Sequence, residues 1–305
     1  MREILHGTNI PFMSYRRIAY LFSGTLVAAT AIWLVVHGGP RYSVDFTGGT
    51  LLQIRTSQVV PADQMRRALD AGGFRGIELQ QMTGDNRNEY LLRMKAGAQG
   101  DLFTGVQGAI QKEVPGVTID LRSNQNVGPK VGGELRSKAV WAILGSLTGI
   151  LLYVGLRYQF KYALGAVVAL FHDVFVTLGM LCFTHREVSL TVVAALLTIA
   201  GYSINDTIVV FDRIRERSKA LRKEKHSRVM DIAVNETLSR TIITSLTVFL
   251  TALALFIWGG EVLRDFSFAM LMGVGFGTYS SVFVASALAL DVWIGLDRRK
   301  GIQAE

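Results

Sequence analysis

The chain has 305 residues, half of them hydrophobic, a net charge of +8 and a mean hydropathy of +0.33. Its apolar residues form uninterrupted blocks, which excludes an ordinary soluble protein and indicates a membrane protein that crosses the bilayer several times. The positive charge gathers in short connections between the blocks, so it indicates topology rather than nucleic-acid binding. The single cysteine, Cys182, excludes a disulfide framework or a cysteine metal cluster.

Six blocks are long enough to cross a membrane as helices. At a rise of about 1.5 Å per residue, about 20 residues cover the roughly 30 Å hydrocarbon core. The first block is followed by residues 37–40, His-Gly-Gly-Pro, without a small-residue cleavage site, so it is interpreted as an uncleaved anchor. The expected spans are 18–36, 139–156, 162–184, 188–211, 241–258 and 266–290.

Basic residues in the short connections predict the orientation of these spans. One side of the membrane receives Arg16, Arg17, Arg157, Lys161, the basic run 213–240, Arg298, Arg299 and Lys300. The other side receives only Arg186 and Arg264, each beside an acidic residue. We therefore expect cytoplasmic termini (1–17 and 293–305), a basic cytoplasmic loop at about 212–240 within the bundle of 139–292, and a periplasmic domain at 37–138.

Between residues 43 and 127 the apolar period changes to short alternating runs, which indicates a separate domain. The expected elements are a strand at 43–56, a helix at 61–71, a hairpin of strands 77–82 and 89–95, a helix at 101–114 and a strand through 117–121. This β-α-β-β-α-β order predicts an α+β ferredoxin-like fold.

The outer domain shows no catalytic pattern. It has no histidine, no cysteine, no G-x-S-x-G and no phosphate-binding loop between Gly39 and Val127. The segment 45–50, Asp-Phe-Thr-Gly-Gly-Thr, is interpreted as a turn or bulge that needs a flexible backbone, in preference to a ligand loop. We therefore expect a binding or load-bearing module and not an enzyme.

Polar residues within the spans are the candidate functional residues, because a charge in the bilayer core costs several kcal/mol and usually faces a bundle interior or a water path. His172 and Asp173 lie near the middle of the third span. Asn205 and Asp206 lie in the cytoplasmic half of the fourth span, and Arg240 begins the fifth. Because these two spans are antiparallel, Asp206 and Arg240 are expected at similar depth, where an ion pair is geometrically possible.

A proton relay is the functional interpretation of these residues. Burial disfavours the charged form of a carboxylate and a nearby guanidinium favours it, so movement of Arg240 would change the proton occupancy of Asp206. Asp173, His172 and Asn205 are further candidates for the relay. Simpler roles stay open: Asp206 could reach the interface, Arg240 could be an ordinary positive-inside residue, and Asp173 could only hydrogen-bond between helices.

Two G-x-x-x-G pairs, Gly145 with Gly149 and Gly273 with Gly277, allow helices to approach closely. Packing within the bundle is the simpler interpretation, and contact with a partner subunit is the alternative. The sequence shows no nucleotide site and suggests no cofactor.

Five segments together resemble the SecD/SecF family of protein translocase subunits, on its SecF side. They are 45–50, 127–132, 171–174, 205–216 and 235–241, of which 205–216 is the strongest signal. The resemblance extends from the first span to the last.

The resemblance implies a subunit of the bacterial Sec export machinery in the inner membrane, akin to half of a proton-driven transporter of the resistance-nodulation-division type. In that family the subunit works with SecD and uses the proton motive force to assist late translocation. The implied partners are SecD, the SecYEG channel, YajC, the unfolded polypeptide and membrane lipid. The family's membrane acid and arginine correspond to Asp206 and Arg240, and Asp173 matches a motif whose role is less settled.

Other functions stay open from the sequence. Half of a proton-driven small-molecule or lipid exporter could share this bundle, although one compact outer domain argues against it. A purely structural translocase subunit would tolerate Asp206→Asn. An intramembrane hydrolase lacks a convincing pair of nucleophile and base, and Ser203 is the nearest candidate nucleophile.

Overall fold

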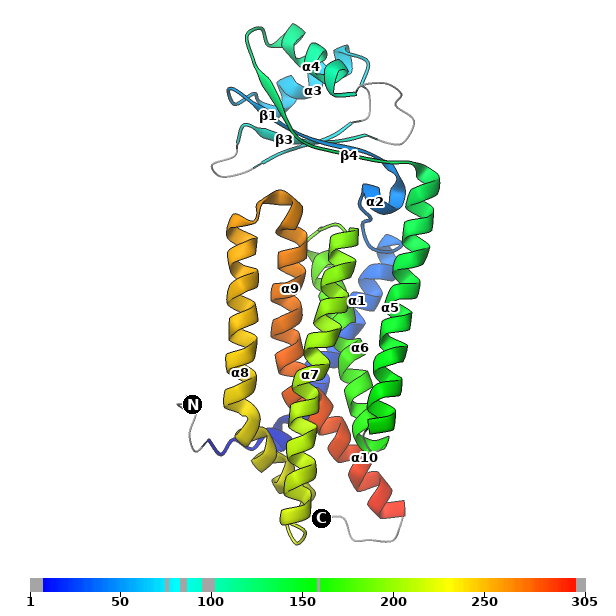
Figure 1. The fold of residues 1–305 in the computed structure, drawn as a ribbon, viewed down its shortest axis with the longest axis vertical. Coiled ribbons are helices and arrows are strands. Elements are labelled where there is room, and N and C mark those ends of the chain that lie inside the picture. Colours follow the sequence, from blue (N-terminus) through cyan, green and yellow to red (C-terminus); the bar gives the residue numbers. More distant parts are fainter. Residues whose placement is uncertain (1–7, 75–76, 83–86, 95–101, 158–159, 300–305) are drawn as a thin grey trace. The chain divides into compact units, whose positions relative to one another are not determined.

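The computed structural model describes residues 8–74, 77–82, 87–94, 102–157 and 160–299. The chain forms two compact units (Figure 1). Tyr42–Val140 make the sheet unit, and Met1–Arg41 with Trp141–Glu305 make the helical unit.

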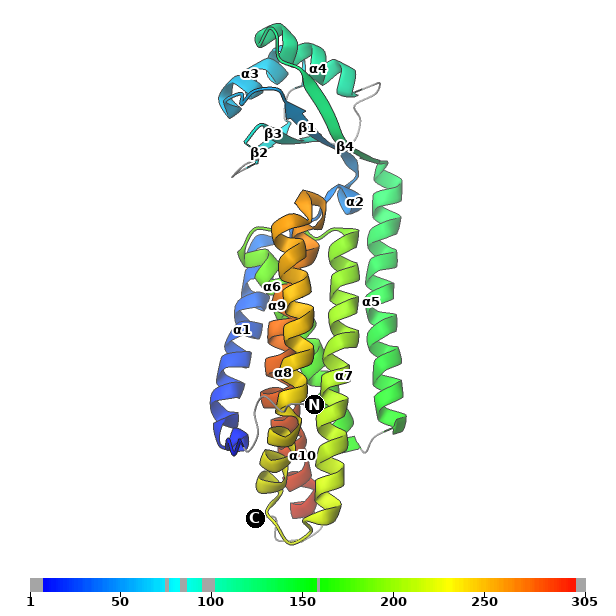
Figure 2. The ribbon, with the colours of Figure 1, turned by 60° about the vertical axis from the view of Figure 1, so that its left-hand side comes forward.

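The described chain contains six helical segments that are long and apolar enough to cross a membrane, as predicted. They are α1 (Arg16–His37), α5 (Pro129–Arg157), α6 (Phe160–Phe183), α7 (Leu190–Ala220), α8 (His226–Trp258), and α9 (Gly260–Ser280), which continues through the π-helical turn Ser281–Ala285 into α10 (Ser286–Arg299). A short 3-10 helix, Phe12–Tyr15, precedes α1. Figure 2 shows the helices of the helical unit running side by side.

The segment 212–240, predicted as a loop, is mostly helical. The helix α7 continues to Ala220, and α8 begins at His226. Arg213 and Arg217 both form ion pairs with Glu236, and the extensions also bury Ile214, Met230 and Val234, so ion pairs and apolar packing together hold them in contact. Hydropathy identified the membrane blocks but not these ends, because charged residues form helical backbone hydrogen bonds as well as apolar ones do.

Small residues set the closest helix contacts. A Cβ atom on Gly273 of α9 would lie 2.2 Å from Ile199 Cδ1 of α7, and one on Gly277 would lie 3.3 Å from Ser203 Cβ. The second G-x-x-x-G pair therefore packs within the bundle. The first pair, Gly145 and Gly149 on α5, has no atom of another helix within 4 Å of where a Cβ would stand.

The helix α5 contributes little to the core of the helical unit. From Trp141 to Arg157, only Val154 is buried among the chain's described residues. This part of α5 is apolar yet exposed, so lipid or another protein must cover it in a membrane.

The sheet unit contains a four-stranded antiparallel sheet in the order β2-β3-β1-β4. Its strands are β1 (Gly49–Thr56), β2 (Glu78–Gln81), β3 (Glu89–Met94) and β4 (Ile119–Val127). Helices α3 (Ala62–Ala71) and α4 (Leu102–Glu113) cover one face (Figure 1). The core beneath them includes Leu52, Ile54, Met65, Leu69, Tyr90, Leu92, Val106 and Ile110. The elements follow one another in the predicted β-α-β-β-α-β order.

The first strand is shorter than predicted, because Val44–Thr47 form a short helix, α2. The Ser43 side chain accepts a hydrogen bond from Asp45 N and begins this helix. Gly48 and Gly49 then adopt φ values of 72° and 131°, which favour glycine, and turn the chain into β1. The flexible backbone expected at these glycines is present.

The remaining boundaries differ by a few residues. The last strand continues to Val127, and Pro61 precedes α3 as its N-cap instead of belonging to the helix. Parts of the expected hairpin turn at 84–88 lie outside the described residues, as do Lys95 and Asp101.

Candidate functional site

The helix α6 places His172 and Asp173 in the interior of the helical unit. Asp173 is 0% exposed and His172 is 4% exposed. His172 Nδ1 lies 2.9 Å from Asp173 Oδ1. The two groups can therefore share the proton that lies between Nδ1 and Oδ1, and the pair is neutral overall when Nε2 carries a hydrogen as well.

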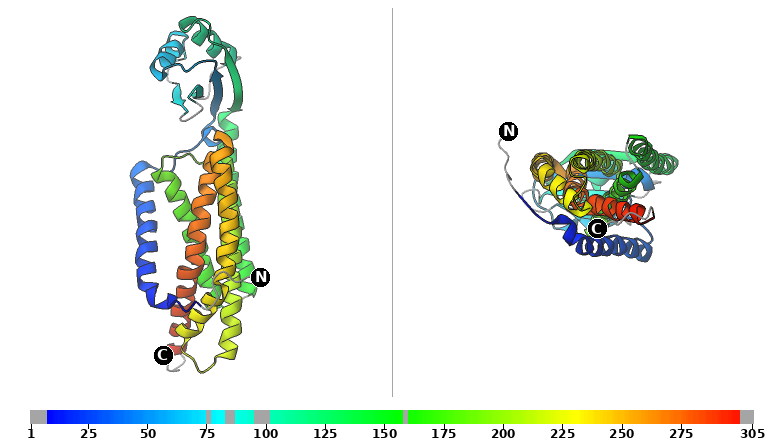
Figure 3. Two further views of the ribbon diagram at one scale, coloured as in Figure 1. Left: turned by 90° about the vertical axis from the view of Figure 1, so that its left-hand side faces the viewer. Right: turned by 90° about the horizontal axis from the view of Figure 1, so that it is seen from below.

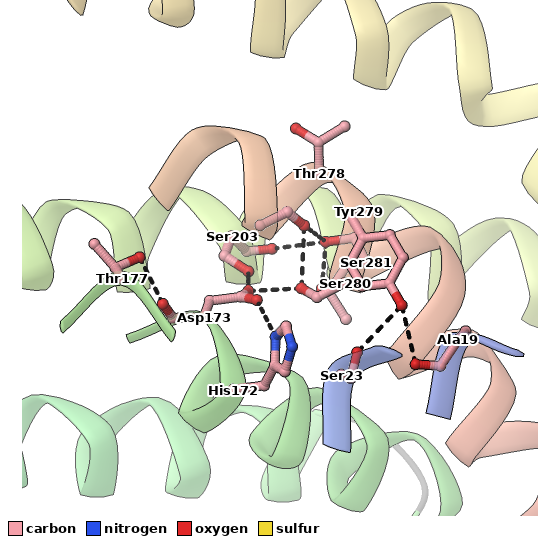
Figure 4. Close-up of polar contacts among 12 residues, drawn as sticks. Ala19, Ser23, His172, Asp173, Thr177, Ser203, Thr278, Tyr279, Ser280 and Ser281 are labelled. Atoms are coloured by element: carbon pink, nitrogen blue, oxygen red, sulfur yellow. Dashed lines mark hydrogen bonds and ion pairs between the residues drawn. The ribbon is translucent and has the colours of Figure 1, made fainter. Parts of the chain in front are cut away.

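The other carboxylate oxygen of Asp173 accepts two hydroxyl hydrogen bonds (Figure 4). Ser203 Oγ of α7 donates to Oδ2 at 2.5 Å, and Ser280 Oγ of α9 donates at 2.7 Å. Among the described residues no lysine or arginine lies within 4 Å of this carboxylate, so only His172 or a proton can balance its charge.

The second nitrogen of the His172 ring, Nε2, is buried and has no hydrogen-bond partner among the described residues. The ring lies 6.3 Å from the ring of Tyr279, whose hydroxyl donates to Ala19 O and lies 3.2 Å from Ser23 Oγ of α1. Because an unpaired buried nitrogen is costly, Nε2 is the atom of this pair best able to take a further proton or donor.

Asp206 of α7 forms a second buried carboxylate and is 3% exposed. Ser245 Oγ of α8 lies 3.5 Å from Asp206 Oδ2. That hydroxyl also accepts from Thr278 Oγ1 of α9 at 2.6 Å and from Tyr202 OH at 3.2 Å. Asp206 is thus connected to α8 and α9 through neutral hydroxyl groups.

The ion pair considered possible between Asp206 and Arg240 is not formed in this structure. Arg240 lies on the exposed face of α8, whereas Asp206 points into the bundle, and no ion pair joins them among the described residues. Arg240 still attracts Asp206 by a longer-range Coulomb interaction. Asn205, next to Asp206, faces outward and is exposed. The structure therefore brings Asp173 and His172 together and leaves Arg240 and Asn205 at the surface.

A run of hydroxyl residues, 278–281, takes part in both sites and was not predicted. Ser281 Oγ lies 2.9 Å from Thr207 Oγ1, and Ser280 reaches Asp173. Four consecutive hydroxyl side chains in an otherwise apolar span were the available signal in the sequence. We call these four residues the hydroxyl run.

No group of three or more metal-ligating side chains occurs in the part of the chain that the structure describes. The chemistry available at these sites is proton binding and hydrogen bonding.

Two family models match the chain. The model described as "Protein export membrane protein SecD/SecF, C-terminal" matches residues 107–294, which include every candidate site residue. The model described as "SecD/SecF GG Motif" matches residues 33–58, which include Gly48 and Gly49.

Curated relatives match nearly the whole chain. The protein translocase subunit SecF of Vibrio alginolyticus is 43% identical over 96% of this chain and 93% of its own length. That of Thermodesulfovibrio yellowstonii is 40% identical, over 95% and 97%. That of Escherichia coli O157:H7 is 38% identical, over 99% and 94%.

Solved structures share the fold. A crystal structure of SecDF, a translocon-associated membrane protein from Thermus thermophilus, matches with a TM-score of 0.84 and 36% identity over 95% of this chain. SecDF in a super-membrane-facing form matches with a TM-score of 0.71 and 38% identity over 97% of this chain. This chain spans only 39% and 40% of those longer chains. With both the family models and near-full-length relatives in agreement, the chain belongs to the SecF family of protein translocase subunits.

Proposed function

We propose that this SecF-family chain acts with a SecD partner in bacterial Sec protein export and uses proton flow to assist late translocation across the inner membrane. The observation that carries this proposal is a pair of buried carboxylates, Asp173 and Asp206, inside a membrane bundle. Neither forms an ion pair with a lysine or arginine among the described residues. A proton is the simplest species that can neutralise such groups.

The energy available from one proton is sufficient to bias a conformational equilibrium. A unit charge that crosses about 100 mV releases about 2.3 kcal/mol. That energy changes an equilibrium constant about fifty-fold, because about 1.4 kcal/mol corresponds to tenfold.

In this proposal Asp206 and Arg240 form the coupling pair. Their separation in the present structure corresponds to a state in which Asp206 is free to bind a proton, and approach of Arg240 would favour its release. Asp173 with His172 supplies a second proton-binding site, and Asn205 faces a neighbouring subunit.

The orientation is part of the proposal. Basic residues at the ends of α7, α8 and α10 support cytoplasmic termini under the positive-inside rule, with the sheet unit in the periplasm. We assign the sheet unit a load-bearing or binding role toward the exported polypeptide.

A SecD partner would complete the membrane assembly. The related SecDF chains are more than twice as long as this one, so they contain parts that this chain lacks. The exposed Asn205 in a membrane helix and the nearly uncovered α5 both support contact with another membrane subunit. The SecYEG channel and YajC are proposed as further partners.

The test is proton-driven export of a reporter protein into inverted membrane vesicles that contain the partner subunits at matched levels. Asp206→Asn removes the titratable group and keeps the side-chain size, so we expect the proton-dependent step to be lost while the complex stays assembled. Asp173→Asn is expected to weaken the same step. Asp63→Asn, an exposed position on α3, is the matched control and should export normally. Unchanged export in Asp206→Asn would instead leave a purely structural translocase subunit.

A further inference from the structure

The hydroxyl run 278–281 lies at the end of α9 and contacts the surroundings of both buried carboxylates. Thr278 Oγ1 donates to Ser245 Oγ at 2.6 Å. Two residues later, Ser280 Oγ donates to Asp173 Oδ2 at 2.7 Å. Consecutive residues of a helix point in different directions, so this run reaches several helices at one level of the bundle (Figure 4).

The other two members of the run contact further helices. Tyr279 OH donates to Ala19 O of α1 at 3.1 Å. Ser281 Oγ lies 2.9 Å from Thr207 Oγ1 of α7 and donates to Gly277 O of its own helix. The run therefore makes hydrogen bonds to α1, α6, α7 and α8, which no other four-residue segment named above does.

The link from this run to Asp206 passes through one hydroxyl group. Ser245 Oγ accepts from Thr278 and lies 3.5 Å from Asp206 Oδ2. Asp206 and Asp173 are thus joined by Ser245, Thr278 and Ser280, and the last two belong to the same turn of α9. Thr278 and Ser280 are connected through the backbone of α9 and not by a hydrogen bond between their hydroxyl groups. The connection therefore transmits a change of position and does not conduct protons.

We propose that the hydroxyl run is a positioning element through which proton occupancy at Asp173 and proton occupancy at Asp206 influence each other. A charged Asp173 carboxylate only accepts hydrogen bonds, and it accepts from both Ser203 and Ser280 in this structure. When a proton binds to Oδ2, that oxygen becomes a donor to one of the two serine hydroxyl groups, and the hydrogen of that hydroxyl has to turn to another acceptor.

Ser280 already has such an acceptor. Its Oγ lies 3.2 Å from Gly277 O in its own helix, so its hydroxyl can turn from Asp173 to that carbonyl. This turn of the hydroxyl breaks the hydrogen bond between Ser280 of α9 and Asp173 of α6. Because Thr278 is on the same turn as Ser280, the change is transmitted to the Ser245 hydroxyl beside Asp206.

The π-helical turn Ser281–Ala285, which begins at the last residue of the run, gives α9 a place to adjust. The turn begins at Ser281, and Ser286 Oγ donates to Ser281 O at 3.0 Å. Such turns interrupt the regular hydrogen bonding of a helix and frequently occur at functional sites. A small rotation of the run can therefore be absorbed without moving the whole of α10.

Other ionisable groups surround the two carboxylates within the described chain. Asp173 faces His172 on its own helix, with Tyr279 of α9 beyond it. Asp206 has Tyr202 nearby through Ser245, and Arg240 acts on it at longer range. None of these groups is removed by the variants below.

The inference rests on the proposed function in one respect, namely that both carboxylates exchange protons. The test therefore measures the protonation of the two carboxyl groups directly and does not measure export. The carboxyl C=O stretch is followed by infrared difference spectroscopy as a function of pH, on the full chain with its partner subunits in lipid vesicles. Asp173→Asn and Asp206→Asn assign the two bands.

Two variants break the run at opposite ends without changing charge. Ser280→Ala removes the hydrogen bond to Asp173, and Thr278→Val removes the one to Ser245. Ser267→Ala is the matched control, because Ser267 is fully buried on the same helix and its hydroxyl donates within that helix to Leu263 O. Thermal unfolding of all three variants checks that they remain folded.

If the run links the sites, each variant changes the proton affinity of both carboxylates, and the distant site changes about fivefold or more. Ser267→Ala should change neither. The inference is overturned if Ser280→Ala affects Asp173 alone and Thr278→Val affects Asp206 alone, or if either carboxyl band fails to titrate.

The result is separable from the proposed function. Loss of the cross-effect, with export still abolished in Asp206→Asn, would remove the link and leave proton-driven export. A clear cross-effect with normal export in Asp206→Asn would keep the link and remove the proton-driven role.

Discussion

Glu89 and Asp173 show two ways in which this chain holds a buried carboxylate. Glu89 in the sheet unit is 7% exposed, and its oxygens accept from Arg55 Nε at 2.8 Å and Gln53 Nε2 at 3.0 Å. Asp173 instead faces hydroxyl groups and a histidine. A guanidinium stays charged at every physiological pH, so Glu89 is a structural residue, whereas the partners of Asp173 allow its charge to change.

The Arg55 partner should therefore matter for the stability of the sheet unit. In Arg55→Met, Glu89 stays buried without its cation, and we expect β1 and β3 to lose about 1–2 kcal/mol of stability. Hydrogen exchange of the β1 and β3 amides in the full chain measures this loss. Arg66→Met, an exposed arginine on α3, should change exchange little. Equal effects of the two variants would show that the Glu89 contact contributes nothing.

Sequence reasoning at this scale singled out polar residues within apolar blocks but did not tell which of them are buried, since Asn205 is exposed. Asp173, His172 and Asp206 are polar residues within apolar blocks, and all three are buried. The direction of Arg240 depends on the rotation of α8 against α7, which hydropathy does not report. The hydroxyl run was not predicted, because serine, threonine and tyrosine side chains carry no charge and lower the mean hydropathy of a span only slightly.

Hydropathy predicted all six membrane helices, because a helix needs about 20 predominantly apolar residues to cross the hydrocarbon core. It missed the extension of α8 back to His226, because charged residues lower the mean hydropathy of a stretch that also buries apolar residues such as Met230 and Val234. It also missed the π-helical turn Ser281–Ala285, since one extra residue in a helix leaves the average hydropathy unchanged. In the sheet unit, alternation placed the strands, and local capping by Ser43 decided where β1 begins.

The α7–α9 contact depends on a missing side chain. In Gly273→Ala the new methyl group would lie 2.2 Å from Ile199 Cδ1, and a β-branched side chain in a helix has little freedom to move away. We expect a loss of about 1–3 kcal/mol of stability, seen as a lower thermal unfolding midpoint in detergent. Gly275→Ala on the same helix meets no atom within 4 Å and should be neutral. A neutral Gly273→Ala would mean that the helices separate readily here.

At the scale of the whole molecule, an even number of spans predicts that α1 begins and α10 ends on the same side of the membrane. The start of α1 and the end of α10 indeed lie at one end of the helical unit (Figure 3). Which side this is follows only from the basic residues, so the topology is a prediction with its own test.

Cysteine labelling tests that topology in intact cells. In a Cys182→Ser background, Asp63→Cys on α3 should react with a membrane-impermeant maleimide added outside, once the outer membrane is permeabilised. Lys223→Cys, exposed between α7 and α8, should react only after the inner membrane is opened. The opposite pattern would invert the proposed orientation. The Cys182→Ser chain without an added cysteine is the control and should not react.

The junction between β4 and α5 has a mechanical consequence. The strand ends at Val127 and the helix begins at Pro129, so Gly128 is the only residue between them. A Cβ atom on Gly132, in the first turn of α5, would lie 2.9 Å from Gly48 N. The backbone of this turn therefore packs directly against the chain at the start of β1. Within the sheet unit, the first turn of α5 and the adjoining ends of β1 and β4 therefore form one continuous piece, so we expect these three segments to move together.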